Sequence, residues 1–387
     1  MVKNIPLISQ PFLTRSVKCY GGHVWANGSI EKGYVSVEDG IVTGTYTTPE
    51  VEPSLKGLVI PRPINAHVHS GDRGIKDMVR RHLKKGRSLN NIVAPPNGIK
   101  HRHLENTDDD QLILDMTIYI KEAFAAGCGG IVDFREGGIR GLRILKQAAG
   151  EIPIRAEALG RPAGLSYDPV ELNAILDRCS GISVSALCDW EPSELEKVAK
   201  HVHGKKGRFA LHASENIREN IDDILELGPD FLVHMVKGTD SDFQRLAQEN
   251  VPVAVCPRAN ALFGLKAPMD KLVRNNVEFA LGTDNAMSAT PDIFSEMGYT
   301  LRHHSRHINP DRLWHGQQLV GKKIINGQQT LSGTTGERAD FLVLSIPPER
   351  FHEALAGGDL AQRISLIMAD GRPFSPEELI EQKVDRT

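Results

Sequence analysis

The chain has 387 residues, of which 40% are hydrophobic, and this is enough for one large domain with its own core and a smaller accessory domain. The formal net charge is −3 and the isoelectric point is about 6.6. A chain so close to neutral has no overall field that attracts nucleic acid or an acidic membrane surface, so neither is expected as a partner.

The cysteines indicate the cellular compartment. Their number is odd, they are scattered, and no CxxC pair occurs, which argues against both a disulfide framework and a thiolate zinc knuckle. We therefore expect a reducing, cytoplasmic environment. The N-terminus lacks the apolar core of a secretion signal, and no uncharged apolar run approaches the length of a membrane span, so a soluble protein is predicted.

The first 58 residues contain short strand-like stretches separated by turn signals, which is typical of a small β-domain. After them, short apolar runs alternate with amphipathic helical segments, the pattern of βα units around a parallel sheet. Eight such runs predict a (β/α)₈ TIM-like barrel, a fold of the α/β class. The runs end near the following residues: His69, Phe134, Gly160, Asp189, His212, His234, Cys256 and Asp284.

The step from the first run to the second is too long by one insertion, at about residues 71–106. We expect a long loop with a helical piece that covers one end of the barrel, and loops of this length are usually functional. The insertion is basic, which predicts either a solvated surface or a lid that binds a carboxylate or phosphate. Its basic residues are Arg80, Arg81, Lys84, Lys85, Arg87, Lys100 and Arg102.

The C-terminal part has the same pattern of short strand-like runs as the N-terminal part, with two such runs after a helical stretch. We therefore expect both termini to pair into one small β-sandwich domain, with the barrel inserted between them. The predicted boundaries are residues 1–58 and 316–387 for the two parts of the sandwich, and 59–315 for the barrel.

Two histidines stand one residue apart at the end of the first apolar run, in INAHVHSGD. In a strand, His67 and His69 point to the same side, roughly 6.5–7 Å apart, so both can reach one ion. The same spacing occurs twice among charged residues, where surface histidines are the simpler interpretation because short motifs often match by chance. These two pairs are His101/His103 and His201/His203.

Three further ligand-type residues follow other apolar runs: His212 after RFAL, His234 after FLV and Asp284 after FALGT. In a (β/α)₈ barrel, all strand ends of this kind open on the face that carries the catalytic groups. Imidazole nitrogens and a carboxylate are ligands for zinc or ferrous iron at a catalytic site. The sequence therefore predicts a metal site on that face.

The run VIPRPINAHVHSGD resembles the first-strand signature of the amidohydrolase superfamily, and HASE, VHMVKG, VAVCPRAN and LGTDNAM resemble its fifth to eighth strand ends. The similarity spans nearly the whole chain, and it is greatest to the branch of cytosine deaminase, adenosylhomocysteine and methylthioadenosine deaminases and triazine hydrolases. The resemblance implies that His234 lies beside the metal-bound water and that Glu215 is a proton shuttle. It implies these metal ligands: His67, His69, His212 and Asp284.

The sequence departs from the family pattern in two places. Arg62 and Pro63 replace the usual small residue ahead of the first strand end. The fourth strand, VSALCDW, has no lysine at its end, whereas family members with two metals commonly use a carboxylated lysine there. Its absence favours a single metal, although Cys188, Asp189 or Glu157 could substitute.

A divalent metal lowers the pKa of bound water to about 7, so hydroxide is available at neutral pH. Glu215 can then take a proton from the attacking water and deliver it to a leaving nitrogen. Asp284 would hold the metal and accept the proton of the water, while His234 would orient the hydroxide and polarise the substrate. Together these residues predict hydrolysis at an sp² carbon with nitrogen as the leaving group.

Several polar residues lie at predicted strand ends and could line the substrate pocket. Trp190 could stack on a flat ring, but a structural tryptophan explains it equally well. The candidates for substrate binding are Arg135, Glu136, Arg161, Trp190, Arg258, Asn260 and Asn285.

The leading hypothesis is a mononuclear aminohydrolase that deaminates a heterocycle such as a purine or pyrimidine, with one divalent metal, zinc or iron. The alternative with the same ligands is a cyclic amidase of the imidazolone ring-opening type. A third hypothesis, a catalytically dead relative that acts in binding or assembly, predicts missing ligands, and none is missing. Family likeness alone suggests a homo-oligomer.

Overall fold

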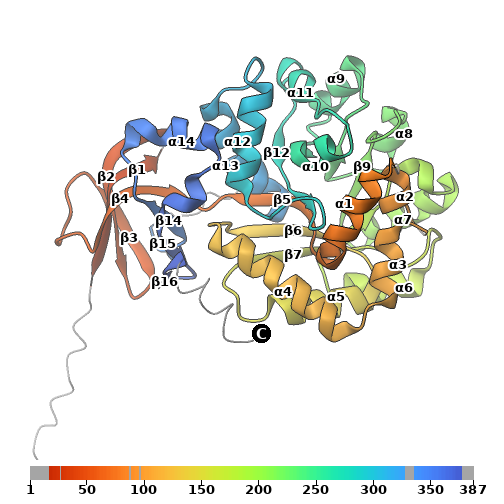
Figure 1. Ribbon diagram of the computed structural model, residues 1–387, viewed down its shortest axis with the longest axis horizontal. Coiled ribbons are helices and arrows are strands. Elements are labelled where there is room, and N and C mark those ends of the chain that lie inside the picture. The colour runs from red at the N-terminus through yellow and green to blue at the C-terminus, as the bar shows by residue number, and fades with distance from the viewer. Residues whose placement is uncertain (1–16, 27, 87–88, 96, 327–334, 377–387) are drawn as a thin grey trace, which may run out of the picture.

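The computed structural model describes residues 17–26, 28–86, 89–95, 97–326 and 335–376. It consists of a large barrel and a smaller β-sheet at one end of it (Figure 1). Within the described residues, no helix is both long and apolar enough to cross a membrane. All five cysteines are free thiols.

The barrel is a parallel sheet in the order β12-β11-β10-β9-β8-β7-β6-β5-β13, in which the last pairing, β13 with β5, closes the ring. Each of the eight predicted apolar runs contributes a strand, which confirms the TIM-like fold. The strands are β5 (Ile64–His69), β6 (Gly130–Arg135), β7 (Arg155–Gly160), β8 (Gly181–Val184), β9 (Arg208–Ala213), β10 (Phe231–His234), β11 (Val253–Val255), β12 (Phe279–Leu281) and β13 (Asp284–Asn285).

Helices lie between the strands and cover the outside of the barrel (Figure 1). Several begin at a side chain that accepts a hydrogen bond from the first turn, as Asp108, Asp168 and Asp292 do. The helices are α4 (Asp109–Ala125), α5 (Gly138–Ala149), α6 (Pro169–Leu176), α7 (Pro192–Gly204), α8 (Ile221–Glu226), α9 (Asp240–Gln248), α10 (Pro257–Leu262), α11 (Met269–Arg274), α12 (Ile293–His304), α13 (Pro310–Asn326) and α14 (Phe351–Gly357).

The eighth strand is interrupted between β12 and β13, and Gly282 lies in the gap. A Cβ atom at Gly282 would stand 2.7 Å from both the backbone nitrogen and the backbone oxygen of His67, so only glycine allows this close approach to β5. The interruption lets one strand pair with β11 through its first half and with β5 through its second half.

A side chain of α13 completes the hydrogen bonding where the ring closes. Gln317 accepts a hydrogen bond from the backbone nitrogen of Leu281 at 2.7 Å, and its amide nitrogen donates to the carbonyls of Leu281 at 3.1 Å and of Ile64. The gap between β12 and β5 therefore has its backbone groups paired by a side chain instead of a neighbouring strand.

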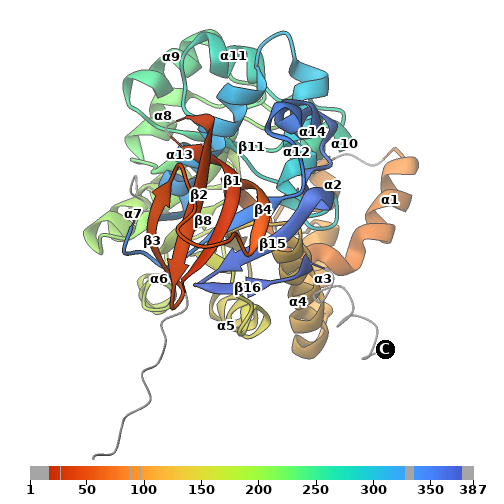
Figure 2. The same ribbon diagram turned by 90° about the vertical axis from the view of Figure 1, so that its left-hand side faces the viewer.

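Both termini form the second sheet, as predicted, in the order β16-β15-β14-β4-β1-β2-β3 (Figure 2). Strand β4 pairs with β1 in parallel and with β14 in an antiparallel ladder, which joins the two ends of the chain. Side chains of β1 to β4, β14 and β15 share one hydrophobic core. The strands are β1 (Lys18–Ala26), β2 (Ser29–Glu38), β3 (Ile41–Tyr46), β4 (Leu55–Pro61), β14 (Phe341–Leu344), β15 (Ile364–Ala369) and β16 (Arg372–Phe374).

The domain boundaries expected at 58/59 and 315/316 fall inside β4 and α13. Strand β4 stays in the small sheet as far as Pro61, because its partners lie there. Helix α13 packs Val320 and Ile324 against residues of the barrel interior. We therefore propose that the barrel extends from Arg62 to the end of α13. The expected domain limits also include residues 1–16, 327–334 and 377–387, which lie outside the described residues.

Arg62, the unusual residue ahead of the first barrel strand, joins the two domains. Its guanidinium pairs with Asp340 at 2.9 Å, donates to the carbonyl of Cys128 and lies 4.9 Å from the centre of the Phe124 ring. Asp340 directly precedes β14 of the small sheet, whereas Phe124 belongs to α4 of the barrel. This arginine therefore connects the small sheet to the barrel, and the histidines of β5 are undisturbed.

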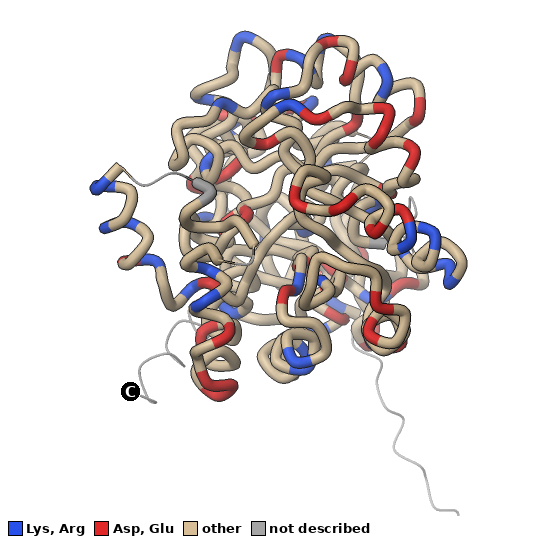
Figure 3. The backbone as a smooth tube through the Cα atoms, turned by 90° about the vertical axis from the view of Figure 1, so that its right-hand side faces the viewer, with Lys and Arg blue, Asp and Glu red and all other residues tan. Residues whose placement is uncertain are grey.

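The insertion at 71–106 is mostly helical, which differs from the expected long loop with one helical piece. It contains the short helix η1 (Ser70–Ile75), α1 (Lys76–Lys84), α2 (Leu89–Val93) and α3 (Ile99–Asn106). These pieces form a core of their own from Ile75, Val79, Ile92 and Ile99 together with Met287. The basic helix α1 stands at the outer edge of the molecule (Figure 3).

Candidate active site

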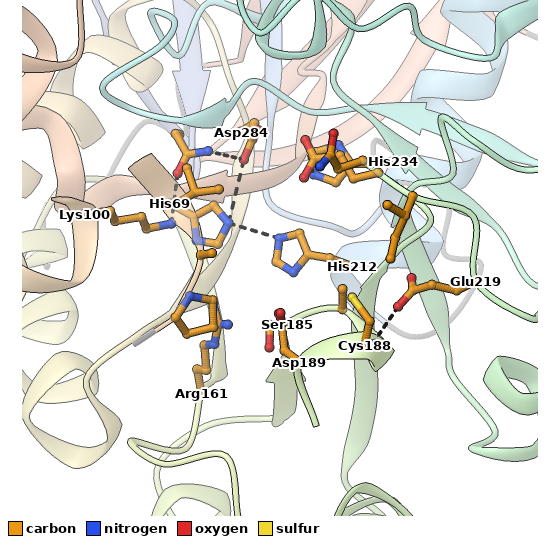
Figure 4. Close-up of a pocket in the computed structure, with 18 residues that line it drawn as sticks. His69, Lys100, Arg161, Ser185, Cys188, Asp189, His212, Glu219, His234 and Asp284 are labelled. Atoms are coloured by element: carbon orange, nitrogen blue, oxygen red, sulfur yellow. Dashed lines mark hydrogen bonds and ion pairs between the residues drawn. The ribbon is translucent and has the colours of Figure 1, made fainter. Parts of the chain in front are cut away.

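His67, His69, His212 and Asp284 converge at the carboxyl ends of the barrel strands, with His234 beside them. Figure 4 shows His69, His212, His234 and Asp284 around the pocket. The Nε2 atoms of His69 and His212 are 3.2 Å apart. Oδ1 of Asp284 lies 3.4 Å from Nε2 of His67 and 3.7 Å from Nε2 of His69. The HxH pair of β5 is thus brought together with β9 and β13, as the sequence predicted.

The hydrogen bonds of the histidines direct lone pairs into the centre of this cluster. Nδ1 of His212 lies 3.1 Å from the carbonyl of Val184, and Nδ1 of His69 lies 2.7 Å from Oε1 of Glu136. Each Nδ1 therefore carries the proton and each Nε2 presents a lone pair. Two such nitrogens facing each other at 3.2 Å repel unless a cation lies between them.

The distances fit a divalent metal ion. Tetrahedral ligands at zinc–nitrogen bond lengths of about 2.0–2.1 Å stand about 3.3 Å from one another. The three distances above range from 3.2 to 3.7 Å. His67 is buried, and neither ring nitrogen has a hydrogen-bond partner among the described residues, although Nε2 lies 3.4 Å from Oδ1 of Asp284. The donor set and its spacing therefore fit a metal.

Burial sets the protonation states that metal binding requires. It lowers the pKa of His69 to about 3, against the attraction of Glu136, and it also lowers the pKa of His67 and His212. Burial opposes ionisation of Asp284 as well, but the surrounding histidines hold the pKa of this carboxyl below its usual range. The cluster thus consists of neutral imidazoles and an ionised carboxylate.

The backbone is strained at two of the strand ends that carry these residues. His234 has φ 75° and Asp284 has φ 59°, in the left-handed region that residues other than glycine seldom adopt. Such strain persists only where the surrounding structure enforces it, and it is concentrated at functional sites.

A second group, Glu215, His234 and Asn260, lies beside the cluster. Nε2 of His234 is 3.5 Å from Oε1 of Glu215. The amide nitrogen of Asn260 lies 3.2 Å from Nδ1 of His234 and 3.4 Å from Oε1 of Glu215, so it orients both side chains. Burial raises the pKa of Glu215, which suits a carboxyl that must both accept and release a proton near neutral pH.

A network of buried charges supports the cluster from the side of β6. Glu136 contacts Lys100 at 2.6 Å and Arg135 at 2.7 Å, in addition to His69. Burial opposes its ionisation, but His69, Lys100 and Arg135 together hold the pKa of Glu136 well below its usual range. Asp72 lies 3.6 Å from Lys100, and burial raises its pKa to about 7.

The cluster forms one wall of a pocket that contains about 840 Å³ of space between atoms, including its opening to solvent. Residues of the insertion, the barrel strand ends and the loops after them line it: His69, Val93, Ala94, Pro95, Lys100, Arg161, Ser185, Ala186, Cys188, Asp189, His212, Glu215, Asn216, Ile217, Glu219, His234, Asp284 and Asn285.

Two of the residues expected to bind substrate, Arg161 and Asn285, line this pocket. Arg161 is of interest because its Nη2 atom is buried and has no hydrogen-bond partner among the described residues. Asn260 instead contacts Glu215 and His234, and Arg135 and Glu136 belong to the buried charge network. These three are placed to support other side chains.

Trp190 and Arg258 are not among the described residues that line the pocket. Trp190 is 5% exposed, and its ring nitrogen donates to Ser185 at 3.2 Å, as expected of a structural tryptophan. Arg258 lies in the first turn of α10, and its guanidinium pairs with the buried Glu296 at 2.5 Å. A residue just past a strand end no longer follows the alternation of the strand, so its position in the sequence does not determine where its side chain points.

The residues considered as substitutes for the absent fourth-strand lysine are not part of the histidine cluster. Cys188 and Asp189 lie on the rim of the pocket, and Glu157 pairs with Arg155 at 2.8 Å. The two other HxH pairs also lie apart from the cluster: His101 faces the carbonyl of Val93 on the insertion, and the second pair is on α7.

Sequence reasoning did not assign a role to Lys100 at the site. It lay in a run of basic residues that suggested a solvated face, and Arg80, Arg81, Lys84, Lys85 and Arg102 are indeed exposed, whereas Arg87 lies outside the described residues. Lys100 is 3% exposed. Its apolar neighbour Ile99 is the only local signal, because Ile99 belongs to the core of the insertion and so turns this end of α3 inward.

The model of the Amidohydrolase family matches residues 58–373, so the chain belongs to this family and is a hydrolase acting on carbon–nitrogen bonds other than peptide bonds. An uncharacterized protein from Methanocaldococcus jannaschii is 33% identical over 321 residues, which cover 76% of this chain and 81% of that protein. The expected superfamily is thereby confirmed.

Solved structures of two deaminases have the same fold. An adenosine deaminase from Xanthomonas campestris with bound zinc superposes with a TM-score of 0.73 at 15% identity, covering 94% of this chain and 96% of the other. A guanine deaminase from C. acetobutylicum with bound guanine gives a TM-score of 0.71 at 14% identity, covering 93% and 100%. At sequence identities this low, the similarity shows a shared fold and nothing more.

Proposed function

We propose that this protein deaminates a heterocycle of the purine, pyrimidine or a related class, with a single divalent ion, zinc or iron, as its cofactor. The observation that carries the proposal is the convergence of three imidazoles and one carboxylate at 3.2–3.7 Å, beside a carboxyl of raised pKa that lines the same pocket.

In this proposal the metal is held by His67, His69, His212 and Asp284. When bound, a divalent ion supplies Lewis-acid activation of water and of the substrate. Glu136 and the carbonyl of Val184 fix the Nδ1 protons of His69 and His212, so that both rings present the same nitrogen to the centre.

The proton transfer is assigned to the neighbouring group. Glu215 takes a proton from the attacking water and delivers it to the leaving nitrogen, while Asp284 accepts a hydrogen bond from the water. His234 faces the reacting carbon and polarises the substrate. Asn260 contacts both His234 and Glu215 and holds these two side chains in position. The products are ammonia and the heterocycle with a carbonyl oxygen in place of the amine.

The pocket suggests how the ring is held. Nη2 of Arg161, which has no hydrogen-bond partner among the described residues, is available to a hydrogen-bond acceptor or an anionic group of the substrate. Asn285 also lines the pocket, with its amide held by Asp284 and Lys100. Deaminases among the proteins of similar fold, one of them with guanine bound, support the choice of a flat nitrogen heterocycle.

The proposal is tested by reconstituting the purified protein with zinc or iron and screening purines, pyrimidines and their nucleosides for ammonia release. A substrate that releases ammonia, with turnover lost on removal of the metal, supports it. Hydrolysis of cyclic amides to ring-opened acids without ammonia would establish the alternative activity instead. Elemental analysis should give about one metal ion per chain, and two would contradict the mononuclear site.

A further inference from the structure

The insertion sends one charged side chain into the metal pocket, the ammonium group of Lys100 on α3 (Figure 4). This side chain is only 3% exposed, although the basic residues of the insertion around it face solvent. Burying an ammonium group is costly unless acceptors surround it. The contacts that Lys100 makes therefore indicate what it does.

Lys100 has two acceptors within hydrogen-bond distance and a third, more distant anionic neighbour, and each comes from a different segment. Its Nζ atom lies 2.6 Å from Oε1 of Glu136 at the end of β6, 2.9 Å from Oδ1 of Asn285 on β13 and 3.6 Å from Oδ2 of Asp72 in η1. Asp72 in turn accepts a hydrogen bond from the backbone nitrogen of Met287 at 2.9 Å. The side chain of Lys100 thus links α3 to the end of β6, to β13 and to η1.

Both acceptors, Glu136 and Asn285, are the immediate supports of proposed metal ligands. Oε1 of Glu136 also contacts Nδ1 of His69 at 2.7 Å. The amide nitrogen of Asn285 donates to Oδ1 of Asp284 at 2.9 Å, and the amide oxygen of the same group accepts from Lys100. Lys100 is therefore one hydrogen-bonded residue away from a ligand on β5 and from a ligand on β13.

These contacts require the insertion to be folded onto the barrel. If α3 moved away, Glu136 and Asn285 would lose the same cation together, and the orientation of His69 and Asp284 would lose support from both sides. Conversely, an ion that holds His69 and Asp284 in place fixes two of the acceptors that Lys100 needs. Coupling of this kind is reciprocal between the two events.

We propose that Lys100 is a positioning residue that couples docking of the insertion to the orientation of the metal ligands His69 and Asp284. The role rests on the metal site proposed above, and it adds that the site is complete only with the insertion in place. Metal binding stabilises the docked insertion, and docking strengthens metal binding.

The first experiment uses the wild-type chain alone. Trypsin cleaves α1 after the exposed Arg80, Arg81, Lys84 or Lys85 only when the insertion opens locally. The rate of cleavage in this segment is compared between the zinc-loaded and the zinc-free protein, with fragments identified by mass. We expect removal of zinc to accelerate cleavage here, and an unchanged rate would overturn the proposal even if every variant failed to fold.

The second experiment compares Lys100→Met with Lys84→Met, which changes an exposed lysine of the same insertion. Loss of a residue that supports metal ligands typically costs 10–100-fold in metal affinity. We expect a weakening of that size for Lys100→Met in competition with a chelator, and none for Lys84→Met. The visible absorption spectrum of the cobalt-substituted protein should change for Lys100→Met only, which a purely structural role would not produce.

The outcomes separate this inference from the proposed function. A wild-type chain that binds no zinc refutes the metal site and this inference with it. Zinc binding by the wild type with unaltered affinity and cobalt spectrum in a folded Lys100→Met variant refutes the coupling and leaves the metal site standing.

Discussion

The closure of the barrel by Gln317 leads to a sharp prediction, because the next residue in α13 offers a matched control. In Gln317→Leu, the buried backbone nitrogen of Leu281 loses its partner and two carbonyls lose a donor. Leaving a buried donor unsatisfied costs about 1–3 kcal/mol, and the lost hydrogen bonds add to this, so we expect a loss of about 2–4 kcal/mol in unfolding free energy.

Gln318 is also buried, at 7% exposure, but neither atom of its amide has a hydrogen-bond partner among the described residues. Gln318→Leu therefore removes an unpaired polar group from the interior and should be neutral or stabilising by up to about 1–2 kcal/mol. The same substitution at adjacent positions is thus expected to act in opposite directions.

The assay is urea unfolding of the metal-free variants, followed by circular dichroism, with the transition midpoints compared at equal slope. Gln317→Leu should unfold at lower urea than the wild type, and Gln318→Leu at equal or higher urea. Because Leu281 lies three residues before Asp284, Gln317→Leu should also bind zinc more weakly. Coincident midpoints for the two variants would refute the role given to Gln317.

Three further predictions concern the site. Asp284→Asn should abolish ammonia release and leave the circular dichroism spectrum largely unchanged, and near-normal turnover would refute the mechanism. Glu215→Gln should lower kcat by about 10²–10⁴-fold with zinc content retained, so loss of zinc instead would show that Glu215 is a ligand. Gly282→Ala places a methyl group 2.7 Å from the backbone of His67 and should weaken zinc binding, as measured against a chelator. Gly204→Ala, where no atom lies within 4 Å, is its control.

The fold could be predicted from the sequence because its signals are local and repeated. Each barrel strand is a short apolar run that ends at a polar residue, and the ends at His69, His212 and Asp284 meet on one face as the geometry of the fold requires. The boundaries were less accurate. The apolar run that includes Leu58 and Pro61 leads into the first barrel strand without a break in the sequence pattern. Its strand pairing nevertheless places it in the small sheet.

The inner surroundings of the site were harder to predict, because they depend on side-chain direction and on contacts between distant segments. Arg258 and Asn260 are two residues apart in CPRAN, but Arg258 pairs with Glu296 while Asn260 reaches His234. The role of Lys100 depends on how the insertion packs, which only its own core of Ile75, Val79, Ile92 and Ile99 determines. No short motif encodes such a packing.

The small sheet built from both termini also constrains how the protein folds during synthesis. Pro61 of β4 pairs with Phe341 of β14, which is 280 positions later in the chain. At about 5–20 residues per second, the ribosome takes roughly 15–55 s to reach that partner. Until then one edge of β4 is unpaired, and an unpaired edge is a site of aggregation. Nascent chains interrupted within the barrel should therefore be the species that most need chaperones, even though the barrel itself is built from neighbouring units.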